Sequence, residues 1–222
     1  MTLCLDIHTH HPAPQPQAVI AASMSDFSPM DGQLYSLGVH PWNTQVPMSG
    51  SDWEEFERLA SLSFVVAIGE CGIDTLKGAP LYKQLLVFKR QIEISEKLGK
   101  PLIIHDVKAH DIIVGLKRDI KPRQKWMVHG FRGKPSVAKM LFSQGIYLSF
   151  GEKFNPETLP TVPSEMILAE TDDSALSIEQ IISNMSAVVG TDMTDQIQSN
   201  TMKFLFNEES IKQEIDINES NS

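Results

Sequence analysis

Three histidines fall within four positions near the start of the chain, in the stretch "LDIHTHHP" at residues 5–12. His8 and His10 are two residues apart, so in an extended segment their side chains point to the same side. Imidazole nitrogen is a common ligand of divalent metal ions in proteins. The pair is therefore either half of a metal site or two solvated imidazoles, and the rest of the chain has to decide between these alternatives.

Four later apolar runs also end in a side chain that can bind a metal. They are Glu70 in "IGECGID", His105 in "LIIHD", His129 in "WMVHGF" and Asp172 in "ILAETDD". A single His at the end of a strand is more often structural than a ligand. Candidate ligands at five strand ends reverse that weighting, because parallel strands bring their carboxyl ends to one edge. The sequence predicts a metal centre made of His8, His10, Glu70, His105, His129 and Asp172.

Short apolar runs alternate with helical patterns, which favours β-α units around a parallel sheet. The expected strands are 3–7, 18–22, 34–39, 64–69, 101–105, 125–129, 146–150 and 166–170. Eight such strands predict a (β/α)8 TIM-type barrel with its active site at the carboxyl ends of the strands.

Helices are recognisable from the fourth expected strand onward. Leu81, Leu85, Phe88 and Ile92 recur at helical spacing, and helices are also expected after Pro135, over 178–189 and over 192–206. The first third differs, because three prolines in "HPAPQPQ" exclude a helix interior and the stretch 23–33 is short and broken. We expect one or both of the first two outer helices to be shortened or missing.

The 222 residues suffice for one large domain, which we place at 1–208, followed by a polar acidic tail at 209–222. No apolar stretch approaches the length of a membrane span, and the N-terminus has no signal-peptide pattern. Two cysteines suit a reducing cytoplasm. The net charge of −9 disfavours a broad nucleic-acid-binding surface, although a local cationic pocket stays open. The sequence leaves the oligomeric state open.

An ordered set of motifs resembles the TatD-like metal-dependent hydrolases of the amidohydrolase superfamily. The motifs are "DIHTH", "GVHPW", "AIGECGID", "PLIIH", "VHGFRG" and "ETD", and the resemblance runs from Asp6 to about Phe206. It implies two divalent cations, one held by His8, His10, Glu70 and Asp172 and the other by His105, His129 and a bridging Glu70. Nitrogen and oxygen ligands without thiolates leave Mg, Mn and Zn equally conceivable.

The resemblance implies a phosphodiesterase or deoxyribonuclease of TatD type that uses a metal-activated water, with Asp172 as general base. A second reading keeps the metals but cleaves an amide or ester, such as an aminoacyl-nucleotide linkage, because a fold does not fix a substrate. A third reading is a non-enzymatic metal-binding descendant of a hydrolase. Such a protein is expected to have lost at least one metal ligand, whereas the motifs here retain all six candidate ligands.

Three further residues are candidate substrate contacts. His40 in "GVHP" is either a substrate or phosphate contact, as the resemblance implies, or an imidazole that caps the turn. The Arg that TatD-like sequences commonly carry two residues after the fifth-strand His is Val107 here, and Lys108 follows it. Arg132 replaces the usual Ser after the sixth strand and can bind phosphate in a bidentate manner. The proline usual after "ETD" is also missing, so we expect an altered pocket.

Overall fold

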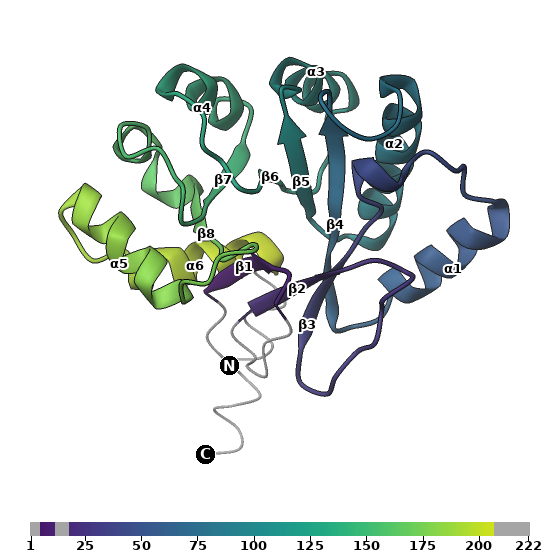
Figure 1. Ribbon diagram of the computed structural model, residues 1–222, viewed down its shortest axis with the longest axis horizontal. Coiled ribbons are helices and arrows are strands. Elements are labelled where there is room, and N and C mark those ends of the chain that lie inside the picture. The colour runs from purple at the N-terminus through teal and green to yellow at the C-terminus, as the bar shows by residue number, and fades with distance from the viewer. Residues whose placement is uncertain (1–4, 12–17, 207–222) are drawn as a thin grey trace.

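A computed structural model describes residues 5–11 and 18–206 of the chain. Within these residues, parallel strands close into a barrel in the order β1 to β8 along the chain (Figure 1). The strands are β1 (Asp6–Thr9), β2 (Ala18–Ala22), β3 (Leu34–Leu37), β4 (Val65–Asp74), β5 (Leu102–Val107), β6 (Trp126–Val128), β7 (Ile146–Phe150) and β8 (Ile167–Ala169). The predicted TIM-type barrel is confirmed.

The helices follow the later strands, as the sequence predicts. They are α1 (Gly50–Ala60), α2 (Leu81–Leu98), α3 (His110–Ile120), α4 (Pro135–Phe142), α5 (Ile178–Val189) and α6 (Thr194–Leu205), with short 3-10 turns η1 (Pro41–Asn43), η2 (Leu159–Thr161) and η3 (Ser164–Met166). The bounds of α5 agree with the prediction, and α6 is shorter by two residues at its start and one at its end. None of the helices in the described part of the chain is long and apolar enough to cross a membrane.

The connection from β2 to β3 contains no helix, which confirms that this outer helix is missing. The proline-rich connection from β1 to β2 falls largely on residues 12–17, which lie outside the described residues, as does the predicted tail at 209–222. Helix α1 was not expected from the sequence. Ser49 and Asp52 form a capping box at its start, in which each side chain accepts a hydrogen bond from the other residue's backbone N–H.

Strand β4 is longer than predicted and runs past Glu70 to Asp74, so Glu70 lies within the strand rather than at its tip. The extension pairs with β5 from Gly72 opposite His105 to Asp74 opposite Val107. Gly72 has a φ of +139°, and a Cβ there would lie 2.2 Å from the carbonyl oxygen of His105. Glycine therefore allows the close approach of the two backbones beside the ends of both strands.

The core has two layers that follow the alternation of the strands. One buried cluster combines strand residues with residues of the surrounding helices, such as Phe88 and Ile181. The second contains Phe204 and Leu205 of α6 together with strand residues, which include the adjacent Val66 and Ala67 where β4 shifts register against β3; the strand residues are Ile7, Val19, Val66, Ala67, Ile103, Met127 and Leu168. The contacts between α6 and β8, which are close together in Figure 1, place this last helix against the strands. The apolar layers leave the carboxyl ends of the strands for polar residues.

Candidate metal centre

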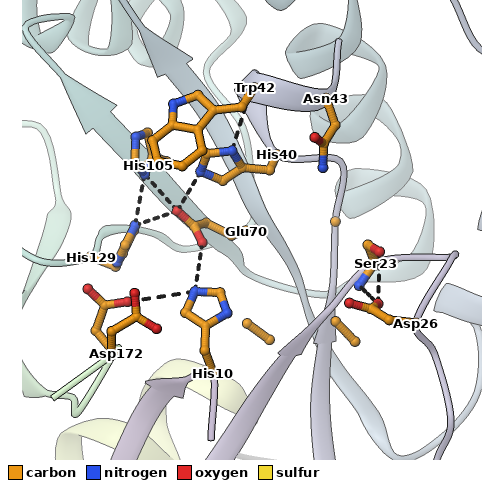
Figure 2. A pocket seen from close by; sticks show the side chains of 14 residues that line it. His10, Ser23, Asp26, His40, Trp42, Asn43, Glu70, His105, His129 and Asp172 are labelled. Atoms are coloured by element: carbon orange, nitrogen blue, oxygen red, sulfur yellow. Dashed lines mark hydrogen bonds and ion pairs between the residues drawn. The ribbon is translucent and has the colours of Figure 1, made fainter. Parts of the chain in front are cut away.

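Five of the six predicted metal ligands line a pocket of about 530 Å³ (Figure 2), and the buried His8 lies beside two of them, Glu70 and Asp172. His8, Glu70 and His105 lie in strands β1, β4 and β5, whereas His10, His129 and Asp172 lie just after β1, β6 and β8. The remaining wall of the pocket comes from the ends of β2 and β3, with Ala22, Ser23, Asp26, Gly38, His40, Trp42 and Asn43 among the lining residues. Residues from seven of the eight strands, or from the segments just after them, thus share one cavity.

Backbone hydrogen bonds hold the first strand against the segment after the last one. The N–H of Asp172 donates to the carbonyl of His8 at 2.9 Å, and the N–H of His10 donates to the carbonyl of Asp172 at 3.1 Å. Asp172 has a φ of +52°, a left-handed conformation that Asp tolerates better than most residues. The closure of the barrel therefore brings together ligands that are more than 160 residues apart in sequence.

The two oxygens of Glu70 face different imidazoles, and Figure 2 shows His10 at one oxygen and His40, His105 and His129 at the other. Its Oε2 is 3.5 Å from Nε2 of His8 and 3.3 Å from Nε2 of His10. Its Oε1 is 2.6 Å from Nδ1 of His105 and 2.8 Å from Nε2 of His129. We call these the His8/His10 end and the His105/His129 end of the site. A carboxylate that serves two ions, one through each oxygen, requires this arrangement.

Asp172 belongs to the His8/His10 end. Its Oδ1 is 3.6 Å from Nε2 of His10 and 3.9 Å from Nε2 of His8. The turn-capping reading of His40 is confirmed, and its role as a substrate contact stays a prediction. Its Nδ1 accepts the backbone N–H of Trp42 and caps η1, while its Nε2 is 3.1 Å from Oε1 of Glu70. The imidazole is thus fixed by a turn and presented to the pocket at the same time.

The donor atoms fit divalent cations. Potential ligand atoms of His8, His10 and Asp172 lie within 4.8 Å of one another, and so do those of His8, Glu70 and His129. Both ring nitrogens of His8 are buried without a hydrogen-bond partner among the described residues. Buried polar atoms are nearly always partnered in folded proteins. The unpartnered nitrogens therefore fit a set of ligands for metal ions.

The charges in the site shift several pKa values. Burial raises the pKa of Glu70, but His129, His10 and His105 outweigh it and hold that pKa well below its usual range. The hydrogen bond to Glu70 raises the pKa of His10 despite burial. Burial lowers the pKa of His129, but the carboxylates of Glu70 and Glu170 outweigh it and place the pKa well above its usual range. Glu70 is thus an anion, and without metal these two imidazoles hold protons more tightly than usual.

The two predicted cationic contacts lie apart from the main pocket. Lys108 is exposed, and it is not among the described residues that line the pocket. Arg132 is exposed and lines a neighbouring hollow of about 130 Å³, which shares Asp172 and Asp173 with the main pocket. Among the described residues that line the main pocket there is no Lys or Arg, whereas four are carboxylates, Asp26, Glu70, Asp172 and Asp173.

Sequence reasoning missed two buried carboxylates beside the site, Asp74 and Glu170. Asp74 accepts a hydrogen bond from the indole N–H of Trp42 at 2.7 Å, and its Oδ2 is 3.5 Å from Nε2 of His105. Glu170 is 3.5 Å from Nδ1 of His129. The only signal was their position in the motifs "GECGID" and "AETDD", next to residues that the strand-end argument did select.

A parallel barrel with His, Asp and Glu ligands at its strand ends defines a metal-binding protein of the TIM-barrel class. The family of TatD-related DNases matches residues 23–197, and the chain belongs to this family. The crystal structure of YjjV, a TatD homologue from Escherichia coli, covers 92% of this chain and 98% of its own with a TM-score of 0.76 at 16% identity. It shows the same fold.

Curated relatives are similar over part of their length. An uncharacterized metal-dependent hydrolase from Buchnera aphidicola is 32% identical over 153 residues, which are 65% of this chain and 57% of that protein. The 3'-5' ssDNA/RNA exonuclease TatD of Erwinia tasmaniensis is 27% identical over 148 residues, 62% of this chain and 56% of the relative. The matched regions thus span less than two thirds of these relatives.

Proposed function

We propose that the protein is a hydrolase that depends on two divalent cations and cleaves phosphodiester bonds. The observation that carries the proposal is the placement of Glu70, whose two oxygens face two separate sets of imidazoles. The name of the Erwinia relative, an exonuclease of single-stranded DNA and RNA, supports a nucleic-acid substrate. A cytoplasmic location remains a prediction, and Cys71 is a buried free thiol that suits it.

One cation would be held by His8, His10, Glu70 and Asp172, and the other by Glu70, His105 and His129. When bound, such a pair supplies Lewis acidity and lowers the pKa of a water molecule. The ligands do not choose between Mg, Mn and Zn. Nitrogen and oxygen ligands disfavour only the softer metal ions, which prefer thiolate sulfur.

The chain's own residues would orient the water and accept its proton. Asp172 has a side chain that is 26% exposed and lines the pocket, so its carboxylate can reach a water molecule there. It would act as the general base. Glu70, whose low pKa keeps it ionised, would contact both ends of the site, one through each carboxylate oxygen. His40 presents Nε2 to the pocket and could donate a hydrogen bond to an oxygen of the substrate.

One observation favours the second candidate function, hydrolysis of an ester or amide such as an aminoacyl-nucleotide linkage. A phosphodiester substrate brings negative charge into a pocket whose described lining has four carboxylates and no Lys or Arg. A neutral or cationic group beside the scissile bond meets less repulsion there. A phosphodiester could still bind, because the positive charge of the bound ions and of Arg132 in the neighbouring hollow would offset this repulsion.

The test is turnover of a panel of substrates after reconstitution with Mg, Mn or Zn. The panel contains a single-stranded oligonucleotide, bis(p-nitrophenyl) phosphate, an aminoacyl-nucleotide and a simple carboxylic ester. Metal-dependent cleavage of the first two is expected. Cleavage of only the ester or aminoacyl substrate would replace the proposal with the second candidate. Binding of metal without turnover of any substrate would favour the non-enzymatic reading.

A further inference from the structure

Each imidazole at the His105/His129 end faces a carboxylate on both sides. His105 presents Nδ1 to Glu70 at 2.6 Å and Nε2 to Oδ2 of Asp74 at 3.5 Å. His129 presents Nε2 to Glu70 at 2.8 Å and Nδ1 to Oε1 of Glu170 at 3.5 Å. In both rings, one nitrogen is directed at the shared ligand and the other at a carboxylate outside the predicted ligand set.

Asp74 is held in place independently of His105. Its side chain is 4% exposed, and its Oδ1 accepts the backbone N–H groups of Leu76 and Lys77 at 2.8 and 3.0 Å. Its Oδ2 accepts the indole N–H of Trp42 at 2.7 Å. Because donors occupy both oxygens, the carboxylate cannot turn away from the imidazole without losing a hydrogen bond.

Glu170 is fixed in a similar way. It is fully buried, and its Oε1 accepts the backbone N–H of Gly130 at 2.6 Å. Gly130 follows His129 directly in the chain, so the same oxygen holds both the backbone after the imidazole and the imidazole itself. Burial of this carboxylate is costly unless it has such partners.

The His8/His10 end is built differently. The two carboxylates within ion-pair distance of His8 both face its Nε2, and no carboxylate of the described residues is found at that distance from its buried Nδ1. The side chain of His10 is 40% exposed. A carboxylate behind a metal-bound imidazole fixes its tautomer and raises its basicity, and loss of that carboxylate typically lowers metal affinity by about 10- to 100-fold.

We propose that Asp74 and Glu170 are positioning residues that keep the proton of His105 on Nε2 and that of His129 on Nδ1. The nitrogen of each ring that faces Glu70 is then free to bind an ion. This makes the His105/His129 end the tighter of the two metal positions. The proposal deepens the proposed function, because it rests on the two-cation site.

Asp74→Asn turns the side chain from a hydrogen-bond acceptor into a donor toward Nε2 of His105. Its oxygen would stay on the backbone N–H groups of Leu76 and Lys77, so its NH2 group would face the indole N–H and Nε2 of His105. Two donors cannot bond to each other, and the imidazole would respond by moving its proton to Nδ1. That nitrogen could no longer bind an ion. Glu170→Gln is milder, because the amide oxygen can still accept both hydrogen bonds.

The experiment is a calorimetric titration of the metal-free full chain with Zn²⁺ and with Mn²⁺. Two binding events are expected. His10→Ala removes a ligand of the His8/His10 end, so the event that it weakens belongs to that end, and we expect this to be the weaker of the two. Asp74→Asn should weaken only the tighter event, by about 10- to 100-fold, and Glu170→Gln should weaken the same event by less. Trp42→Phe, which removes a donor to Asp74 but keeps the carboxylate, should change it by less than about threefold.

A matched control is available in Asp106, whose Oδ2 lies 2.5 Å from Nδ1 of His110 outside the ligand set. Asp106→Asn removes a carboxylate from an imidazole in the same way, and it should leave both events unchanged. Long-range ¹H–¹⁵N NMR of the zinc-loaded chain gives a second readout. It should show His105 protonated on Nε2 in the parent and on Nδ1 in Asp74→Asn.

The proposal is overturned if Asp74→Asn and Glu170→Gln leave the tighter event unchanged or weaken both events equally. It is also overturned if they weaken the event that His10→Ala weakens. Circular dichroism of the metal-free variants comes first, and if Asp74→Asn does not fold, Glu170→Gln decides alone by the same criterion. A parent chain that binds no metal would instead refute the metal centre of the proposed function.

Discussion

The two ends of the metal centre differ in how much the protein encloses them. At the His105/His129 end the side chains are 14% and 8% exposed, and they belong to β5 and to the end of β6, in the part of the chain that contains helices α2, α3 and α4. At the opposite end, His8 is fully buried, but His10 is 40% and Asp172 26% exposed. The next wall of the pocket comes from β2, which no helix separates from β3. We infer that the enclosed end retains an ion and the open end meets the substrate.

Replacing the residue that both ends share should have the largest effect. Glu70→Gln removes the charge that faces imidazoles through both oxygens. We expect the metal content to fall from about two ions per chain toward zero, and turnover to fall about 10⁴-fold or more. Elemental analysis and turnover check this.

Asp26 provides the control for Glu70, because its carboxylate lines the same pocket away from the imidazoles. Asp26→Asn should retain both ions. Loss of an ion from only one end in Glu70→Gln would show that Glu70 does not bridge the two.

Replacing Asp172, which belongs to the open end alone, should lower turnover while the ion at the other end stays bound. Asp172→Asn keeps the shape of the side chain but removes the proposed general base, so turnover should fall about 10²- to 10³-fold. The ion at the His105/His129 end should remain. Titration of metal content together with the pH profile of turnover tests this, and unchanged turnover would exclude Asp172 as the base.

Metal affinity should rise with pH at both ends. In the metal-free chain the pKa values of His10 and His129 are raised, chiefly because of Glu70, and Glu170 adds to the effect at His129. An ion must displace these protons, so affinity should still be rising at pH 6.5, the usual pKa of His, and should rise by about tenfold per pH unit for each proton displaced until the pH exceeds the raised pKa values. Conversely, acid should release the metal.

Calorimetry in buffers of different ionisation enthalpy counts the displaced protons. Glu170→Gln removes one of the two carboxylates that raise the pKa of His129, so its affinity should depend less steeply on pH. An affinity that stays constant between pH 6.5 and 8 would contradict the assignment of protonated imidazoles in the metal-free state.

The smallest effects are expected from the cations outside the main pocket. Arg132 lines the hollow that shares Asp172 with the open end, so Arg132→Ala should lower turnover of a phosphodiester about 10- to 100-fold, or about 1.4–2.7 kcal/mol. Metal content should not change. Lys108→Ala should do less, because an ammonium lacks bidentate geometry. If both variants match the parent, the phosphate contact is absent, and preserved ester or amide hydrolysis would favour the second candidate function.

Most of the fold could be predicted because its signals are local. Each strand is a short apolar run, and α5 repeats apolar residues at helical spacing, so its bounds at Ile178 and Val189 follow from the sequence. Helix α1 was missed although Ser49 and Asp52 give a local start signal, because it contains few fully buried residues, Phe56 and Ala60. The end of β4 was misplaced because Gly69 and Gly72 resemble a strand stop. The tertiary contact with β5 instead makes them points of close approach.

The sequence by itself determined which side chains could bind metal, because their chemistry is intrinsic and a parallel barrel brings all its strand ends to one edge. Only the tertiary structure decided how each carboxylate is used. Glu70 faces imidazoles through both oxygens, whereas Asp74 and Glu170 face the far sides of two of those rings. Those roles depend on distances across the barrel between residues from different strands. Spacing along the chain does not contain such distances, because they arise when the barrel closes.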